Sequence, residues 1–357
     1  MHRILVINPG STSSKVAVYH GDMEWCGAGI DHPHHELGRY AHVAEQYALR
    51  RDAVLCFLEG AGVRPPDLDA VVGRGGMLRP IPSGTYRVNA RMLEELRAPG
   101  EREHISNLGA LIAHEIAAPA GRPAFVVDPV CVDEFPPIAR VAGLPGIERR
   151  SLSHALNLKA AARHAARELG ARYEDVNLVV AHLGGGISVS AHRRGRMVDV
   201  NQGLDGTGPF APERAGGLPI GDVMRMAYSG RYTYDALFRL VTRQGGLLAH
   251  VGTNDAREVE RCIAEGDDHA RLIYEAMAYQ IAKEIGLMAT VLCGEVQAVV
   301  LTGGAGVFRD ARRLDLGASA LDRAGAPLPG GARDGGYGAG RPARLAGRRR
   351  GQGVLIP

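Results

Sequence analysis

The first thirty residues alternate short apolar runs with polar turns. Residues 4–7 (ILVI) are apolar enough for a short buried strand, and the Asn-Pro-Gly that follows breaks it. Residues 15–19 (KVAVY) form a second β-prone run, and a third begins at Met23 after a turn at 20–22. The pattern predicts three consecutive strands joined by two tight turns.

The same pattern returns about halfway along the chain. The apolar run 178–183 (LVVAHL) precedes three glycines at 184–186, and two further β-prone runs follow within 187–200. A third glycine turn, at 302–304, follows the strand-like run 296–301. A repeat of this kind predicts two similar α/β domains that face a nucleotide in the cleft between them.

Helical spacing of apolar residues marks 154–169 and 271–293, and packing into a core explains their leucine, alanine and methionine positions. A chain of 357 residues is long enough for two domains, each with its own core.

Charge is uneven along the chain. The formal net charge is +3, but residues 309–357 hold ten Arg and four Asp, so the rest of the chain carries −3. The body of the protein therefore gives no electrostatic reason to expect nucleic acid as a partner. No uninterrupted apolar run is long enough for a membrane helix, and five scattered cysteines fit a reducing compartment. We expect a cytoplasmic protein with neither nucleic acid nor membrane as a partner.

The first turn has the residues that a phosphate needs. Glycine lets the backbone approach closely, hydroxyls and amides can donate, and a lysine supplies charge. It is not a Walker A loop, because Val16 follows the lysine and a strand continues. A hairpin with a polar tip explains this stretch alone slightly better, but the second and third glycine turns favour phosphate binding. The candidate nucleotide residues are Asn8, Gly10, Ser11, Thr12, Ser13, Lys15, Gly184, Gly185, Gly186, Gly303 and Gly304.

Seven segments carry a resemblance to a known family. They are INPGSTSSKVAV, VVGRGGMLRPIPSGTYRVN, EHISNLGALIA, FVVDPVCVDEFPP, RRSLSHALNLKAAAR, VAHLGGGISVSAHRRGRMVDVNQGLDGTGPFAPERAGGLP and AVVLTGG. The chain resembles the acetokinase family of the actin/hexokinase/heat-shock-type ATPases. GRGG…GTYRVN and GPFAPERAG are similar to its butyrate-kinase branch.

The resemblance implies a fold and a reaction. The fold is α/β, with two duplicated ribonuclease-H-like (actin-like ATPase) domains at 1–150 and 151–308 and a nucleotide cleft between them. The reaction is reversible transfer of a phosphoryl group from ATP, with Mg²⁺, to butyrate; acetate, propionate or a branched-chain acid is the alternative acceptor. A homo-oligomer, dimeric or larger, is also implied. The rival from another class is a non-catalytic nucleotide-binding switch on the same scaffold.

Residue roles also follow from the resemblance. Arg214, His154, Asp128 and Arg74 match catalytic positions, and Arg74, His104 and Asn107 match the substrate side. Asn8 and Asp128 would lie near the metal, the glycines at 184–186 near phosphates, and Gly303 and Gly304 near adenosine. A strand-end arginine or aspartate, or a lone histidine, also has a plain structural explanation. His32, His34, His35 and His42 lack metal-site spacing and are expected in a solvated link.

The C-terminal segment departs from the family. From residue 309 to 357 there is neither Lys nor Glu, and Gly, Ala, Arg and Pro dominate. The family has a strand, an acidic turn and a helix in this place. Reading the codons of LPGGARDGGY one base later permits Tyr-Pro-Gly-Glu-(His or Gln)-Glu-Met-Glu-Ala, which resembles that ending. The segment is therefore predicted to be out of frame from near residue 310 to 320.

Overall fold

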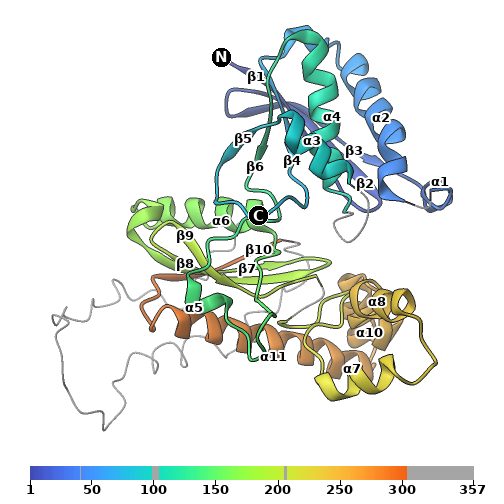
Figure 1. Cartoon of the computed structure of the whole chain (residues 1–357), viewed down its shortest axis with the longest axis vertical. Coiled ribbons are helices and arrows are strands. Elements are labelled where there is room, and N and C mark those ends of the chain that lie inside the picture. The colour runs from blue at the N-terminus through green and yellow to red at the C-terminus, as the bar shows by residue number, and fades with distance from the viewer. Residues whose placement is uncertain (41, 99–103, 205–206, 304–357) are drawn as a thin grey trace. The chain divides into compact units, whose positions relative to one another are not determined.

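The computed structural model describes residues 1–40, 42–98, 104–204 and 207–303 (Figure 1). The chain divides into two compact units. The first comprises residues 1–135 and 150–156, and the second comprises 136–149 and the chain from Asn157 onward. Gly304 and the predicted out-of-frame segment 309–357 lie outside the described residues.

A six-stranded sheet forms the centre of the first unit, in the order β3-β2-β1-β4-β6-β5. The first three strands are antiparallel, β4 and β6 continue the sheet parallel to β1, and β5 runs antiparallel to β6. The predicted strand–turn–strand–turn–strand start is confirmed. The strands are β1 (Arg3–Pro9), β2 (Ser13–His20), β3 (Met23–Asp31), β4 (Ala70–Arg74), β5 (Thr85–Arg87) and β6 (Ala124–Val127).

Helix α4 packs directly on the middle of this sheet. A Cβ placed on Gly73 of β4 would lie 2.1 Å from the carbonyl oxygen of Gly109 in α4, so the two glycines let helix and strand touch through their backbones. This close contact fixes the end of β4, where Arg74 lies. The helices of the unit are α1 (His34–Leu37), α2 (Tyr47–Gly60), α3 (Ala90–Arg97) and α4 (Asn107–Ala117), with 3-10 turns at Val43–Gln46, Pro65–Asp67 and Ala118–Ala120.

The second unit repeats the arrangement around a four-stranded sheet, in the order β10-β7-β8-β9. Strands β7, β8 and β9 are antiparallel, and β10 lies parallel to β7 as β4 lies parallel to β1. The duplication predicted from the two glycine-containing patterns is confirmed. The strands are β7 (Asn177–Leu183), β8 (Ile187–Arg193), β9 (Arg196–Val200) and β10 (Ala298–Gly303).

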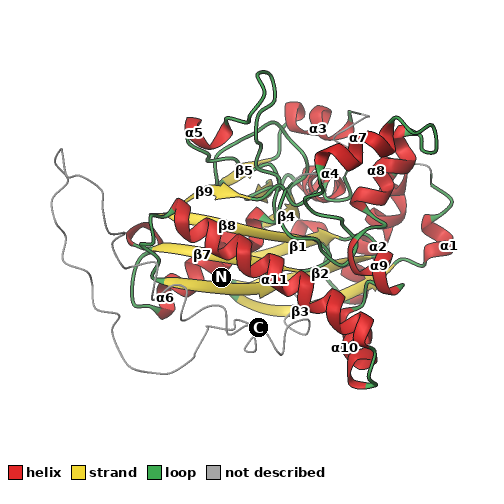
Figure 2. Ribbon diagram, turned by 90° about the horizontal axis from the view of Figure 1, so that it is seen from below, coloured by secondary structure: helices red, strands yellow, loops and turns green. Residues whose placement is uncertain are grey.

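The long helix α11 runs along the second sheet (Figure 2). Its residues Met277, Ile281 and Met288 are buried in the core of the second unit. Core packing explains the methionines of α11, as the helical spacing predicted, but not its leucines Leu272 and Leu287, which are exposed. The helices are α5 (Pro137–Arg140), α6 (Ala155–Glu168), α7 (Ile220–Ala227), α8 (Tyr234–Thr242), α9 (Gly246–Val251), α10 (Ala256–Ala264) and α11 (Asp268–Val291), with a 3-10 turn at Tyr173–Asp175.

His192 in β8 makes the second unit sensitive to acid. The imidazole is fully buried between the hydroxyls of Tyr173, at 2.6 Å, and Ser190, at 2.8 Å. Burial, and then the charges of Lys159 and Arg163, lower its pKa to about 3. Because the folded pKa lies below the unfolded value of about 6.5, unfolding takes up a proton between these values. The stabilisation is complete above about pH 6.5 and is lost as the pH falls toward about 3.

We expect the free energy of unfolding of the second unit to fall by up to about 1.4 kcal/mol per pH unit in that window on account of His192. Urea unfolding measured from pH 7 down to pH 4 checks this. His192→Gln should flatten the profile whatever its absolute stability, and His269→Gln, at an exposed position of α11, should keep the wild-type slope. An unchanged slope in His192→Gln would contradict the assignment.

Candidate functional site

The turn between β1 and β2 exposes its amides and hides its carbonyls. The Ser11 carbonyl accepts from Arg50 at 3.0 Å, the Thr12 carbonyl accepts from the His32 amide at 2.7 Å, and the Ser13 carbonyl accepts from the Gly10 amide at 2.7 Å. In the described part of the chain the amides of Ser11 and Thr12 donate to no partner, and both residues are exposed. Such a turn can receive an anion on its amide side.

Three candidate residues form a row beside this turn. Lys15 on β2 pairs across the sheet with Asn8 on β1. Arg74, the last residue of β4, donates from Nη1 to Asn8 Oδ1 at 3.3 Å. Burial lowers the pKa of the half-buried Arg74 guanidinium, which remains a cation at neutral pH. The structure therefore brings Asn8, Lys15 and Arg74 together at the carboxyl ends of parallel strands, where ligands of open α/β sheets bind.

Asp128 follows β6, the strand beside β4. Arg74 pairs with Val127, so Asp128 lies one residue further along the same edge. Its backbone φ is 40°, a left-handed value that is uncommon for a residue other than glycine. Its carboxylate is buried, and Oδ1 accepts from Ser83 Oγ at 2.6 Å and from the Gly84 amide at 2.9 Å. These two donors fix the Asp128 carboxylate at the end of β6.

Metal-ligand side chains are not clustered in the described ranges, where no group of three or more His, Cys, Asp and Glu could hold an ion. A magnesium ion in a phosphoryl-transfer site needs only one or two carboxylates, because phosphate oxygens and water complete its shell. Asn8 and Asp128 fit such a minimal set.

Asn107 and His104 lie at the start of α4, in the first unit. The buried Asn107 amide accepts from the Met77 backbone amide at 2.9 Å and donates to the Leu96 carbonyl at 3.4 Å. Its side chain therefore holds the loop that follows Arg74. His104 Nδ1 lies 2.7 Å from Ser106 Oγ. Both residues line a cavity of about 410 Å³, whose other walls include Val43, Tyr47, Leu96, Leu108 and Leu111.

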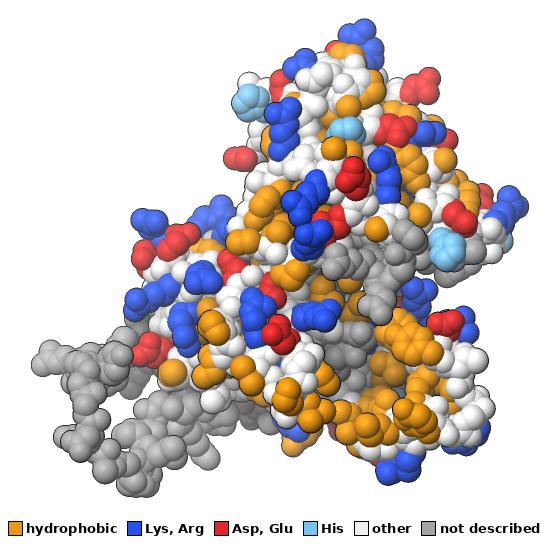
Figure 3. Space-filling model, in the orientation of Figure 1, with side chains coloured by type: hydrophobic (Ala, Val, Ile, Leu, Met, Phe, Trp, Pro, Cys, Tyr) orange, Lys and Arg blue, Asp and Glu red, His pale blue; other side chains and the backbone are white. Residues whose placement is uncertain are grey.

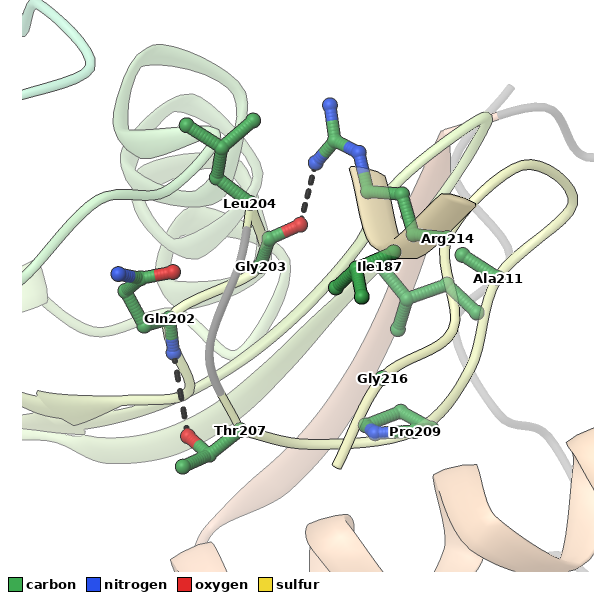
Figure 4. Close-up of a pocket in the computed structure, with 10 residues that line it drawn as sticks. Ile187, Gln202, Gly203, Leu204, Thr207, Pro209, Ala211, Arg214 and Gly216 are labelled. Atoms are coloured by element: carbon green, nitrogen blue, oxygen red, sulfur yellow. Dashed lines mark hydrogen bonds between the residues drawn. The ribbon is translucent and has the colours of Figure 1, made fainter. Parts of the chain in front are cut away.

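In the second unit, Arg214 lies against the glycine turn between β7 and β8. A Cβ placed on Gly186 would lie 2.4 Å from Arg214 Nη1, so the guanidinium occupies the space that any side chain would need. Figure 4 shows Arg214 pointing toward Gly203, whose carbonyl accepts a hydrogen bond from Nη1. The Arg214 carbonyl in turn accepts from the Ala211 amide at 2.9 Å. Gly184–Gly186 and Arg214 are therefore brought together by the second unit alone.

Gly303 ends β10 beside the same turn. It pairs with Leu183, the last residue of β7, and its φ is 105°. A Cβ there would lie 2.4 Å from the Leu183 carbonyl oxygen, so only glycine fits. His154 is half-buried just before α6, in the segment 150–156 that clusters with the first unit.

His182 is a candidate that the sequence interpretation missed. It lies in β7 two residues before the glycine turn, and its Nδ1 atom lies 2.7 Å from Asn157 Oδ1. A Cβ on Gly184 would lie 2.8 Å from His182 Nε2. The available signal was a titratable residue inside an otherwise apolar strand that runs directly into three glycines.

The expectation that His32 is solvated was wrong. His32 is buried, and its Nε2 atom lies 2.9 Å from Ser14 Oγ. The reason is that β3 pairs with β2 up to Asp31 and Ser13, so the next residue packs behind the first turn. His35 and His42 are exposed, as expected.

The second half of the chain matches a known protein family. Residues 146–317 match the model of the acetokinase family. Over this segment the chain is similar to that family. The matched acetokinase segment includes the glycine turn at 184–186 and Arg214. It ends at residue 317, close to the position from which the segment 309–357 was predicted to be out of frame.

Solved structures with the same fold are acetate and propionate kinases. An acetate kinase from Porphyromonas gingivalis is 21% identical, with a TM-score of 0.69 over 86% of this chain and 84% of that one. A propionate kinase from Francisella tularensis is 21% identical, with a TM-score of 0.69 over 88% of each chain. An acetate kinase from Entamoeba histolytica is 17% identical, with a TM-score of 0.66 over 87% of this chain and 84% of that one.

The fold of the chain is therefore the actin-like ATPase fold of these kinases, with two duplicated α/β units, as the sequence predicted. Within the described residues, no helix has the length and apolar character that crossing a membrane requires.

Proposed function

We propose that the protein is an ATP-dependent carboxylate kinase, which converts a short-chain carboxylate and ATP to an acyl phosphate and ADP, reversibly. The observation that carries this proposal is the acetokinase match over residues 146–317, which contains Arg214 and the glycine turn it contacts. The free amides of the first turn and the cations beside it support the same function.

The residues suit the chemistry of this transfer. A carboxylate is ionised at pH 7, so its oxygen can attack the γ-phosphorus without a general base. A new bond forms between that oxygen and phosphorus, while the bond from phosphorus to the bridging oxygen breaks and ADP leaves. The difficulty is to bring anions together and to stabilise the equatorial oxygens, which calls for arginines and amides. Arg74 and Arg214 are the proposed side chains for this purpose, and His154 is a further proposed stabiliser.

Magnesium, when bound, would neutralise charge on the β- and γ-phosphates. We propose that Asn8 and Asp128 hold it from the first unit. The amides and hydroxyls of Ser11, Thr12 and Ser13, together with Lys15, would bind phosphates, and Gly184–Gly186 would bind them from the second unit. Gly303, and Gly304 outside the described residues, would face adenosine.

Butyrate is the proposed carboxylate, with Arg74, His104 and Asn107 on its side of the site. The support is the similarity of GRGG…GTYRVN and GPFAPERAG to the butyrate-kinase branch. Two extra methylenes in an apolar pocket would contribute about 0.8 kcal/mol each, enough for a preference over acetate. The solved acetate and propionate kinases support acetate or propionate as the acceptor about as well as the motif similarity supports butyrate. Hydroxamate trapping of acyl phosphate across C2 to C5 acids, with butyrate and acetate in direct competition, distinguishes them.

A non-catalytic nucleotide switch is the rival class. It would bind ATP on the same scaffold and need no cation at the transferring phosphoryl group. The placement of Arg214 on the glycine turn favours the kinase. Tight nucleotide binding with no acyl phosphate from any acid in the series would favour the switch.

The contact between Gly186 and Arg214 gives a sharp test. In Gly186→Ala the new methyl would overlap the Arg214 guanidinium, which is the mobile end of a side chain, so folding should survive while the arginine is displaced. We expect turnover to fall roughly 100-fold or more, the effect of losing one preorganised donor. The measurement is steady-state kinetics together with thermal unfolding.

Gly286→Ala is the matched control, because Gly286 lies in α11, outside the proposed site, and a Cβ on it has no heavy atom within 4 Å. It should keep turnover within a few-fold of wild type. Equal losses in the two variants would mean that the loss in Gly186→Ala is not specific to Arg214.

An apolar surface supports the proposal of a homo-oligomer. Figure 3 shows hydrophobic side chains gathered over α7 and α8, and the exposed ones there include Ile220, Met224, Tyr228 and Tyr234. Contiguous apolar surface of this kind often marks a protein interface. We also propose a cytoplasmic location, and the free state of all five cysteines fits a reducing compartment.

A further inference from the structure

Arg50 is a fully buried cation in the first unit that pairs with no carboxylate of the described residues. It lies on α2, and its hydrogen bonds go to neutral acceptors: Gln46 Oε1, the carbonyls of Ser11 and Ser13, and Ser14 Oγ. Burial lowers its pKa to about 10, so the guanidinium stays charged at neutral pH. The next residue, Arg51, pairs with Asp52 and Glu115 near the surface.

Burying a charge without an opposite charge beside it costs a large desolvation free energy, so buried charges in proteins are normally paired. Hydrogen bonds to neutral oxygens offset only part of this cost. Among the described residues no acidic side chain supplies such a counter-charge for Arg50. The groups it contacts belong to residues 11–14 and to Gln46, the residue just before α2. A buried cation beside a turn with free amides is what an anion-binding site requires.

The guanidinium also sets the direction of the turn's amides. Nη2 donates to the Ser11 carbonyl at 3.0 Å, and Nη1 donates to the Ser13 carbonyl at 3.3 Å and to Ser14 Oγ at 3.1 Å. In a trans peptide the carbonyl and the following amide point in opposite directions. Because the Ser11 carbonyl points toward Arg50, the Thr12 amide points away from it, and no described residue accepts from that amide.

We propose that Arg50 is a positioning residue of a polyphosphate site. It holds the Ser11–Ser14 turn from behind with the carbonyls inward and the Thr12 amide outward, and its charge is balanced by the bound polyphosphate. The inference rests on the proposed function in one respect, since the natural polyphosphate would be that of the nucleotide. It goes further by assigning the site a buried residue that does not touch the ligand.

The test uses the full chain and inorganic triphosphate as the probe. Affinity is measured by titration calorimetry, and hydrogen exchange is measured at the Thr12 amide without ligand. Arg50→Met should weaken triphosphate binding about tenfold or more, because it removes a nearby charge from a low-dielectric region. It should also change Thr12 exchange. Arg50→Lys keeps the charge but not the planar fork, so it should recover only part of the affinity.

Arg51→Met is the matched control, since it removes the same kind of cation from the neighbouring position of α2. It should bind triphosphate as wild type does. A folded Arg50→Met with affinity within about twofold of wild type and unchanged Thr12 exchange would overturn the proposal. If Arg50→Met does not fold, the same result in Arg50→Lys would overturn it.

The outcome is separable from that of the kinase proposal. Triphosphate binding that depends on Arg50 but not on Arg51 supports the inference even if no acyl phosphate is ever formed. A folded wild-type chain that does not bind triphosphate overturns the inference, whatever its activity.

Discussion

Arg214→Ala is expected to cut turnover of the proposed carboxylate kinase by roughly 10³-fold or more, the size of effect seen when a phosphoryl-stabilising arginine is lost. The guanidinium lies on the Gly186 turn, where the proposed phosphates would bind. Affinity for the nucleotide should change much less, because the glycine turn and the first-unit turn would still bind its phosphates. Steady-state kinetics with both substrates varied, in a chain whose C-terminal frame is restored, measure the two effects separately.

Arg225→Ala serves as the control for charge alone. Arg225 is an exposed arginine of α7 that pairs with Asp222, so its loss should leave turnover near wild type. Arg214→Lys should recover only part of the lost rate, since lysine cannot reproduce the planar fork. Near-wild-type turnover in Arg214→Ala would remove Arg214 from the mechanism.

Restoring the C-terminal reading frame should have a comparably large effect. In the first unit the sheet continues beyond β4 with β6, whereas β10 is the last strand of the second unit that the structure describes. The resemblance implies a strand, an acidic turn and a helix of the first domain in the place of the segment 309–357. As written, this segment carries glycines at 330, 331, 335, 336, 338 and 340, which would cost a helix up to about 1 kcal/mol each.

We expect the chain as written to be much less stable than the frame-restored chain and to form little or no acyl phosphate. A typical domain is stable by only about 5–15 kcal/mol. Without the implied helix, the apolar face that it would cover stays exposed, and this loss could remove most of that stability. Thermal unfolding and hydroxamate trapping on both chains decide the question. If the chain as written melts cooperatively and turns over like the restored one, the reading frame of the segment 309–357 affects neither stability nor activity.

The repeated hairpins could be predicted from sequence because their signals are local. Apolar runs of four to six residues bounded by Asn-Pro-Gly or by three glycines specify strand and turn without reference to the rest of the chain. The position of Arg74 at the end of β4, and of Asp128 just after β6, followed from the same local reading.

Arg50 and His32 could not be predicted in this way. An arginine on a helix and a histidine before a proline normally face water, and only the packing of α2 and β3 behind the first turn buries them. Asn107 illustrates the same limit. Its match to a substrate-side position gave no sign that its amide accepts from Met77 and donates to Leu96.

The central claim is phosphoryl transfer to a carboxylate, and one measurement tests it most directly. The frame-restored chain is incubated with MgATP and butyrate, and ADP and hydroxamate-trapped butyryl phosphate are quantified together. A carboxylate kinase gives the two products in equal amounts, only when both substrates are present, and Arg214→Ala lowers the rate of forming both by roughly 10³-fold or more. ADP formed without acyl phosphate, or nucleotide bound without either product across the C2 to C5 acids, would contradict the claim.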